Sequence, residues 1–323
     1  MLRFLKKIFI DDPIVRTKKI YFWLYYLLGV RFSILYLPYY YWYVLRPIRV
    51  GTDGRVGVLQ LSSDVIYGCN LRCEFCTAFS PYRKGYVSAE ELLTSYKQWR
   101  KKLKPQYFKL TGGEPLLHPE LATILRESAK IWDDSKLWLN TNGLLLKSVP
   151  VDVLHAIKET GYELVITEHT FEPEHREKLD AGYARLKQEG IHFVVRPSRI
   201  SWLALYQYGD HEQSGICEVF IPYKSNPKRA WSNCVSRHCM AISGERLYKC
   251  NYLLQVHDGI QEGILDTGLW KEALTYQPLT LQSSSEEIIT HLRTRTVPAC
   301  TVCYEKRLTI ISRQIPLKTN ERQ

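Results

Sequence analysis

Three cysteines lie close together in the stretch CNLRCEFC, which covers 69–76. Three residues separate the first pair and two separate the second, so the stretch offers three thiolates where a structural zinc site takes four. Thiolates at this density also suit an iron-sulfur cubane, and three cysteines leave one iron of a cubane without a protein ligand. The sequence therefore predicts a 4Fe-4S cluster with one open iron on Cys69, Cys73 and Cys76.

The chain has nine cysteines in 323 residues, and no small-residue cleavage site is evident after its apolar N-terminal runs. This cysteine content predicts metal or redox chemistry in a reducing cytoplasm rather than a disulfide scaffold. Residues 1–50 hold nine Lys and Arg against two Asp, so they carry +7 of the net +11 and leave +4 for the rest. We therefore expect no nucleic-acid partner for the body of the chain.

Residues 1–50 form a basic, aromatic-rich segment whose two apolar runs, 20–30 and 32–45, are separated or broken by Arg31 and Pro38. Neither run reaches the roughly 20 apolar residues that a membrane-spanning helix needs. Tyrosine, tryptophan and lysine favour the headgroup region of an anionic membrane. The segment is therefore expected to anchor a cytoplasmic protein to the cytoplasmic membrane surface, the alternative being a helix packed on the rest of the chain or on a second copy.

Strand-like and helix-like patterns alternate from residue 56 onward. The expected strands cover 56–66, 107–113, 136–143, 162–169 and 191–198, and the expected helices cover 88–103, 118–131, 151–161 and 173–190. Consecutive strand-helix units predict an α/β fold with parallel strands and crossover helices. Ligands bind at the C-terminal ends of such strands, where the cysteine stretch, TGGEP and NTNG all fall.

The motifs at these strand ends resemble those of one family. The cysteine triplet has an aromatic residue, Phe75, before its third cysteine; the next strand ends in TGGEP at 111–115, and the following one in NTNG at 140–143. Over 56–198 the chain resembles the radical S-adenosylmethionine (radical SAM) enzymes. The resemblance implies a partial (β/α)6 TIM-like barrel of parallel strands, which we assign to residues 56–215.

The resemblance also implies the chemistry and its cofactors. In the family, a reduced 4Fe-4S cluster splits S-adenosylmethionine (SAM) into methionine and a 5′-deoxyadenosyl radical, which takes hydrogen from a substrate. The electron comes from a one-electron reductant such as flavodoxin or ferredoxin. The residues expected to contact SAM are Phe75, Gly112, Gly113, Glu114, Asn140 and Asn142. The glycines would allow close approach to the cofactor or simply make a tight turn, and the asparagines would bind the ribose or make the turn before the next helix.

Three charged or titratable residues end the fourth and fifth strands and are candidate catalytic residues. Glu168 and His169 end the fourth strand, and Arg196 ends the fifth. Members of the family often hold the carboxylate of SAM or the substrate at these positions. A salt bridge between Glu168 and Arg196 is the structural alternative.

The C-terminal residues 216–323 resemble the auxiliary-cluster modules called SPASM and Twitch, a small Cys-rich α+β unit. The stretch 233–250 reads as cysteine, hairpin and cysteine with Gly244 at the turn, and PACTVC at 298–303 adds a C-x2-C pair. The resemblance implies a second 4Fe-4S cluster on four of five cysteines. These are Cys250, Cys300 and Cys303, with either Cys234 or Cys239 as the fourth ligand. A structural zinc site is the alternative, and the lone Cys217 is expected to be a small buried hydrophobe.

A cluster with complete cysteine ligation has no free site for substrate, so its expected role is to move an electron. The function we expect is an oxidation, an epimerisation or a bond-forming step on a carbohydrate, a lipid-linked sugar or another small metabolite. A peptide maturase of the SPASM type is the alternative enzyme. A zinc-binding scaffold is the alternative that is not an enzyme.

Overall fold

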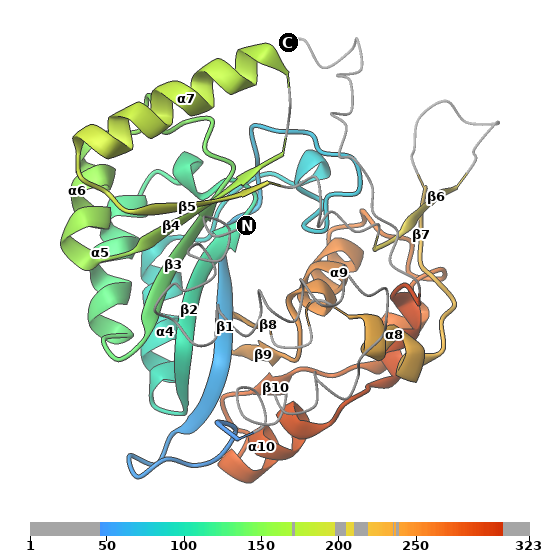
Figure 1. Cartoon of the computed structure of the whole chain (residues 1–323). Coiled ribbons are helices and arrows are strands. Elements are labelled where there is room, and N and C mark those ends of the chain that lie inside the picture. Colours follow the sequence, from blue (N-terminus) through green and yellow to red (C-terminus); the bar gives the residue numbers. More distant parts are fainter. Residues whose placement is uncertain are drawn as a thin grey trace, which may run out of the picture.

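The computed structural model describes residues 46–169, 172–197, 205–209, 219–234, 236 and 239–305. Its centre is an eight-stranded sheet with the strand order β10-β9-β8-β1-β2-β3-β4-β5 (Figure 1). The strands are β1 (Val56–Ile66), β2 (Leu103–Gly112), β3 (Lys136–Thr141), β4 (Glu163–Glu168), β5 (Phe193–Pro197), β8 (Cys239–Ser243), β9 (Arg246–Tyr248) and β10 (Leu279–Thr280). The sheet does not close into a barrel, because β10 and β5 are its two edges.

Four helices follow the first four strands, as the alternating pattern predicted. They are α4 (Ala89–Arg100), α5 (Leu121–Ile131), α6 (Val151–Thr160) and α7 (Pro173–Gln188). The C-terminal region contributes α8 (Pro227–Asn233), α9 (Asn251–Gln261) and α10 (Ser285–Arg293), while β6 (Gln207–Gly209) and β7 (Val219–Ile221) form a separate antiparallel pair. The helices α4 to α7 cover one side of the sheet, and α9 lies on the other side (Figure 1).

The strands β1 to β5 are parallel, which confirms the predicted α/β architecture. A sixth parallel strand is present, but it is β8 from the C-terminal region, which pairs with β1 from Gln60↔Cys239 to Ser63↔Ile242. The predicted hairpin with Gly244 at its turn is β8 and β9. The C-terminal region therefore extends the same sheet instead of forming a separate layer.

The first boundary between helix and strand differs from the prediction. Helix α4 ends at Arg100 and β2 already begins at Leu103, whereas the sequence pattern placed these boundaries at residues 103 and 107. The earlier start follows from pairing, because Leu103 and the next two residues align with the first residues of β1. Propensity alone does not reveal such pairing.

The two faces of the sheet differ in polarity because strand residues alternate between them. The helix-covered face carries fully buried apolar side chains, among them Leu61, Phe108, Leu110, Leu139, Leu164 and Ile166. The opposite face, here called the inner face, carries Gln60, Ser62, Asp64, Lys109, Thr111 and Asn140. Helix α9 lies against this inner face, where Asn251 Nδ2 donates to Ser62 Oγ at 3.4 Å. The inner face can therefore hold polar ligands.

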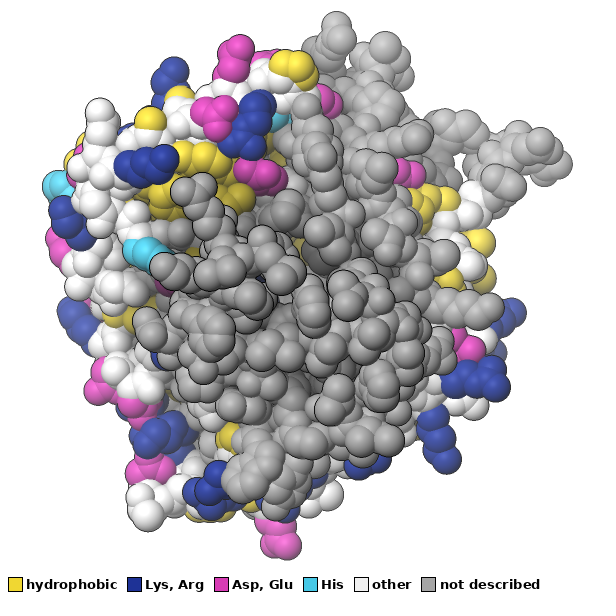
Figure 2. Space-filling view, in the orientation of Figure 1, with side chains coloured by type: hydrophobic (Ala, Val, Ile, Leu, Met, Phe, Trp, Pro, Cys, Tyr) yellow, Lys and Arg dark blue, Asp and Glu magenta, His cyan; other side chains and the backbone are white. Residues whose placement is uncertain are grey.

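The predicted membrane anchor falls almost wholly outside the described residues, as does Cys217. Among the helices that the structure describes, none is long and apolar enough to cross a membrane. On the described surface visible in Figure 2, basic and acidic side chains are interspersed.

Candidate functional site

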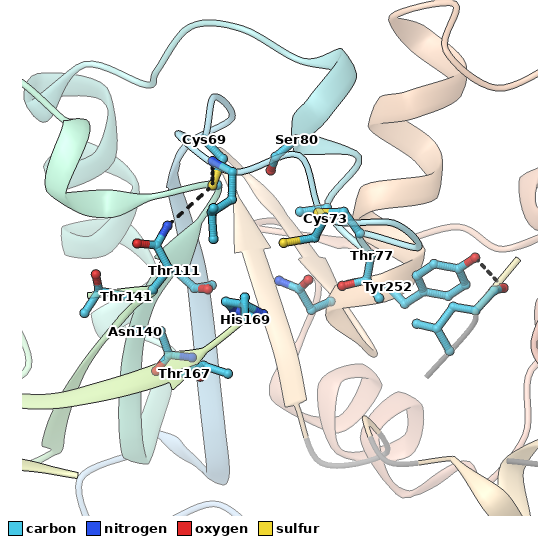
Figure 3. Close-up of a pocket in the computed structure, with 18 of the residues that line it drawn as sticks. Cys69, Cys73, Thr77, Ser80, Thr111, Asn140, Thr141, Thr167, His169 and Tyr252 are labelled. Carbon is cyan, nitrogen blue, oxygen red and sulfur yellow. Dashed lines mark hydrogen bonds between the residues drawn. The ribbon is translucent and has the colours of Figure 1, made fainter. Parts of the chain in front are cut away.

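One cavity of about 350 Å³ joins the cysteine stretch to the C-terminal ends of the parallel strands. Cys69, Cys73 and Cys76 all line it, so the structure brings together the three predicted cluster ligands. Figure 3 shows side chains from the strand ends on one side of the cavity and Tyr252 of α9 on the other. The lining from the strands is polar: Thr111, Asn140, Thr141 and Thr167. This combination of thiols and polar groups around one space fits a cluster with a bound polar cofactor.

The cysteine loop is held by tight turns and by aromatic packing. The N–H of Cys76 donates to the carbonyl of Cys73 at 3.2 Å, and Phe75 adopts a left-handed φ of 56°. Such a φ is costly for a residue that is not glycine, so neighbouring contacts must maintain it. The N–H of Phe75 donates to the hydroxyl of Tyr208 at 3.2 Å, and the two rings lie 4.7 Å apart. The ring of Phe75 thus packs in an aromatic cluster with Tyr206 and Tyr208.

Gly112 and Gly113 are required by the backbone that passes next to them. A Cβ on Gly112 would lie 2.2 Å from the carbonyl oxygen of Ile66, and Gly112 also has a φ of 138°. A Cβ on Gly113 would lie 2.0 Å from the carbonyl oxygen of Gly68. The N–H of Gly113 donates to the Ile66 carbonyl at 2.8 Å, which fixes the chain just before the cysteines. The two glycines therefore position the cysteine stretch, and both also line the cavity.

Glu114 is fully buried and its carboxylate connects two strand ends. It accepts hydrogen bonds from Thr141 Oγ1 at 2.7 Å, from the N–H of Asn142 at 2.7 Å and from the N–H of Leu116 at 3.0 Å. Burial raises the pKa of Glu114, while these donors lower it. Glu114 is not among the residues that line the cavity, and its carboxylate positions the start of NTNG; its contact with SAM stays a prediction.

The two asparagines of NTNG have different roles, and both line the cavity. Asn142 Oδ1 accepts from the N–H of Leu144 at 3.0 Å, as the turn interpretation predicted, and its Nδ2 donates to Asn70 Oδ1 at 2.7 Å. Asn140 Oδ1 is buried and has no hydrogen-bond partner among the described residues. A buried acceptor without a donor is unfavourable unless a ligand or water supplies one. Asn140 is thus the stronger candidate for a cofactor contact.

Only one of the three candidate catalytic residues lines the cavity. His169 does so, and burial lowers its pKa to about 4, so the imidazole is neutral at pH 7. Glu168 lies on the helix-covered face, where its Oε1 accepts from Arg176 at 2.8 Å and from the Tyr183 hydroxyl at 2.9 Å. The guanidinium of Arg196 lies 5.5 Å from the centre of the Trp138 ring. The predicted salt bridge between Glu168 and Arg196 is therefore wrong, because Arg176 of α7 pairs with Glu168.

Two thiols of the cysteine stretch, those of Cys69 and Cys76, are protected from ionisation in the absence of a metal. Burial raises the pKa of Cys69 to about 12, although the nearby N–H of Leu71 lowers it. Burial also raises the pKa of Cys76, and the N–H groups of Ser80, Ala78 and Phe79 oppose this shift. Those N–H groups would donate to a thiolate once iron replaces the proton. The loop thus supplies the donor environment of a cluster ligand.

The C-terminal cysteines interact electrostatically, since charge on Cys234, Cys239 or Cys300 raises the pKa of Cys250. Burial raises the pKa of Cys303 well above its usual value, and charge on Cys234, Cys250 or Cys300 raises it further. Cys250 precedes the first residue of α9, whereas Cys300 lies in the short 3-10 turn Pro298–Val302 and Cys303 directly follows it. We call Cys234, Cys250, Cys300 and Cys303 the auxiliary thiols.

Cys239 is held differently from the auxiliary thiols. It is the first residue of β8, and its sulfur accepts from Gln60 Nε2 at 3.2 Å and from Lys109 Nζ at 3.4 Å. Both donors belong to the inner face of the sheet. These two contacts favour Cys234 over Cys239 as the fourth auxiliary thiol, although charge on Cys239 also raises the pKa of Cys250.

The spacing of the auxiliary thiols bears on the kind of metal they could hold. Within the described part of the chain, no three Cys, His, Asp or Glu side chains converge closely enough to hold a single metal ion. Zinc needs four ligands around one ion, with sulfurs at about 2.3 Å. In an iron-sulfur cubane each thiolate binds a different iron, so the ligands stay further apart. Metal analysis of the purified protein distinguishes the two.

Helix α9 connects the two thiol sites, a connection that no pattern in the sequence predicted. The residue before it, Cys250, is an auxiliary thiol, whereas Asn251 and Tyr252 at its start line the cavity of the cysteine stretch. Tyr252 is held in place by donating to the carbonyl of Leu205 at 2.8 Å (Figure 3). No local sequence signal places a C-terminal helix over the strand ends. Thr111 and Thr167 were also missed, although strand alternation alone would have placed them on the inner face.

Arg83 ties the end of the cysteine loop to α9. Its guanidinium, only 1% exposed, forms ion pairs with Asp258 at 3.2 Å and with Glu262, and donates to Gln255 Oε1 at 2.8 Å. It also lies over the ring of Tyr67 at 4.1 Å. Arg83 therefore fixes the end of the cysteine loop to α9, the helix that directly follows Cys250.

Residues 64–189 match the family model described as the Radical SAM superfamily. The matched segment contains the three cysteines of the cavity, TGGEP and NTNG. The chain therefore carries a radical SAM domain, the domain of a class of enzymes that work by radical chemistry. The resemblance deduced from the motifs is confirmed.

Curated relatives resemble between a third and a half of the chain. The GTP 3',8-cyclase of Aquifex aeolicus is 35% identical over 118 residues, which are 34% of this chain and 35% of that protein. The GTP 3',8-cyclase 3 of Mycobacterium bovis is 32% identical over 158 residues, which are 46% of this chain and 38% of that protein. The chain thus spans little more than a third of the length of these relatives. A solved structure of BtrN in complex with AdoMet and 2-DOIA covers 78% of this chain and 98% of that chain at 12% identity, with a TM-score of 0.41 that is too low to support an inference.

Proposed function

We propose that this protein is a radical SAM enzyme that holds a 4Fe-4S cluster on Cys69, Cys73 and Cys76 and binds SAM in the adjoining cavity. The observation that carries the proposal is the meeting of the three thiols with the polar ends of β2, β3 and β4 around one cavity, inside a segment that matches the Radical SAM superfamily. When bound, the reduced cluster would supply the electron that splits SAM to give a 5′-deoxyadenosyl radical. A one-electron reductant such as flavodoxin or ferredoxin would reduce the cluster again after each transfer.

The residues of the chain would orient SAM and exclude water. Asn140 Oδ1, buried without a donor in the described part of the chain, would accept from a hydroxyl or amine of SAM. The hydroxyls of Thr111 and Thr167 face the same cavity. His169 adds a neutral imidazole, because burial keeps its pKa at about 4. The cavity wall would therefore bind SAM through dipoles and not through an ion pair with these four residues.

We also propose that the auxiliary thiols hold a second 4Fe-4S cluster. The support is the electrostatic interaction among these thiols, together with the hydrogen bonds that Gln60 and Lys109 donate to the sulfur of Cys239. Because α9 begins between the two sites, an electron released by a substrate in the cavity would have a short path past Tyr252. Losing that electron would turn hydrogen abstraction into an oxidation or a bond-forming step on the substrate.

Two substrate classes are candidates. A carbohydrate or lipid-linked sugar follows from the sequence interpretation, whereas the name of the curated relatives, GTP 3',8-cyclase, favours a nucleotide. The nucleotide candidate rests on similarity over little more than a third of those relatives. Incubation of the enzyme with SAM, dithionite and either GTP or a nucleotide-sugar pool distinguishes them, because only the true substrate class is consumed in proportion to 5′-deoxyadenosine.

The central experiment is anaerobic reconstitution with iron and sulfide, followed by metal analysis and SAM cleavage. We expect about eight irons per chain, two cubanes, and reductant-dependent formation of 5′-deoxyadenosine. Zinc in place of iron, with no SAM cleavage, would overturn the enzyme proposal in favour of a zinc-binding scaffold. About four irons with SAM cleavage would retain the first cluster and reject the second.

A further inference from the structure

Lys249 places a positive charge on the residue that directly precedes Cys250, one of the auxiliary thiols. It lies between β9 and Cys250, and its side chain is only partly exposed. The ammonium donates to the backbone carbonyls of His291 at 2.7 Å and of Leu292 at 3.3 Å. Among the described residues, no carboxylate forms an ion pair with it. The charge is therefore held by neutral dipoles and is not cancelled by an acid.

The position of this ammonium is fixed from several sides. His291 and Leu292 lie in the last turn of α10, where the carbonyl ends of the helix favour a cation. The backbone N–H of Lys249 donates to the hydroxyl of Tyr276 at 2.7 Å, and that hydroxyl contacts His291 Nε2 at 2.9 Å. The ammonium thus cannot swing away without breaking its contacts to the α10 end, while Tyr276 fixes the backbone of Lys249.

The thiols and the ammonium act on one another electrostatically. A lysine ammonium is positively charged at pH 7, and burial here opposes that charge while thiolates on Cys250 and Cys300 favour it. In turn, the lysine lowers the pKa of Cys300 against the effect of burial. In partly buried surroundings such an interaction is screened far less than at the surface.

A cluster bound by four thiolates is anionic, and its reduction adds one electron and hence one more negative charge. A fixed positive charge nearby favours the reduced form more than the oxidised form. Net charge and solvent exposure are known determinants of iron-sulfur potentials. We propose that Lys249 raises the reduction potential of the auxiliary cluster, so that the cluster accepts an electron from the substrate radical in the cavity. This inference rests on the proposed auxiliary cluster.

The test is a redox titration of the auxiliary cluster at pH 7, followed by electron paramagnetic resonance. The Cys73→Ala background isolates that cluster, because it removes a ligand of the other one. Lys249→Gln keeps a hydrogen-bond donor for the α10 carbonyls but removes the charge. We expect at least a tenfold weaker equilibrium for reduction, which is a shift of 59 mV to more negative potential for one electron. Lys249→Arg should stay close to the parent protein.

Lys158→Gln is the matched control, because it removes the same charge from the exposed surface of α6 and should leave the potential unchanged. An unchanged potential in Lys249→Gln, with about four irons retained, would overturn the inference and leave the auxiliary cluster intact. If Lys249→Gln loses iron, Lys249→Met is titrated in its place. Iron loss in both neutral variants with retention in Lys249→Arg would also overturn it, since the lysine would then hold the site together and not set its potential. Failure of the parent protein to bind the auxiliary cluster would instead reject the proposed function.

Discussion

The two thiol sites of this protein differ in number of cysteines and in what surrounds them. The cavity site offers three thiols beside a space lined by threonines and asparagines. The auxiliary site offers four thiols, and Cys250 and Cys303 pack against apolar and aromatic side chains such as Tyr252, Val302 and Tyr304. A missing fourth thiol thus coincides with room and polar groups for another ligand, whereas a complete set coincides with closure. The number of thiols at a site and the side chains that line it together indicate which of the two sites performs chemistry.

The largest expected effect comes from removing one thiol of the open site. Cys73→Ala should abolish formation of 5′-deoxyadenosine from SAM, because the cluster loses one of only three protein ligands. Iron should fall from about eight to about four per chain, since the auxiliary thiols are untouched. Anaerobic product analysis and iron determination measure both. Retained SAM cleavage in this variant would contradict the assignment of the open site.

The next effect separates Cys234 from Cys239 within the closed site. Cys234→Ala should lose about half of the iron, because its thiol belongs to the auxiliary set. Cys239→Ala should keep the full iron content, because the sulfur of Cys239 is turned toward Gln60 and Lys109. Iron analysis of the two variants, prepared in parallel, is the measurement. The reverse pattern would show that Cys239 is the fourth ligand.

A smaller effect tests how the open site is positioned. In Gly113→Ala the new methyl group would meet the carbonyl oxygen of Gly68 at 2.0 Å, so the cysteine stretch must shift. We expect a loss of roughly 1–3 kcal/mol in the free energy of unfolding, and weaker SAM cleavage. Gly68→Ala is the matched control, because its methyl group would meet no atom within 4 Å. Urea unfolding under anaerobic conditions compares the two; equal midpoints would refute the steric explanation.

The open site was far easier to predict from sequence than the closed one. Cys69, Cys73 and Cys76 lie in one short stretch, and the strand pattern placed TGGEP at the neighbouring strand end, so local spacing was sufficient. The choice of Cys234 over Cys239 depends on β8 pairing with β1, which brings Cys239 beside Gln60. Such long-range pairing leaves no mark in the local sequence. The same holds for α9, whose first turn completes the cavity.

Buried side chains also escaped prediction, because their partners decide their role. Glu114 belongs to a motif that suggested direct cofactor contact, yet its carboxylate is saturated by donors from its own and the next strand end. The side chain of Glu168 similarly lies on the helix-covered face, where its carboxylate accepts a hydrogen bond from Arg176 of α7. Side chains alternate between the two faces along β4, so Glu168 and His169 point to opposite faces. This alternation would have predicted that only one of the two reaches the cavity, whereas the residue types at the strand end would not.

The smallest effect concerns the charge of the two sites. The open site holds a neutral imidazole, since burial lowers the pKa of His169 to about 4, whereas the closed site holds the cation of Lys249. An unfolded histidine binds a proton below about pH 6.5, but folded His169 does so only below about 4. The unfolded state therefore binds more protons between these values, so this residue lowers stability as the pH falls from 6.5 toward 4.

For His169 the cost should be about 1 kcal/mol at pH 5.5 and should vanish above pH 7. His169→Gln should therefore be less sensitive to acid than the parent protein, as measured by urea unfolding at pH 5.5 and 7.5. His192→Gln is the control, because the side chain of His192 is 79% exposed. If both variants respond to acid as the parent does, the imidazole of His169 is accessible to protons in the folded state. The open site would then carry a titratable charge, and the contrast with the closed site would rest on thiol number and lining alone.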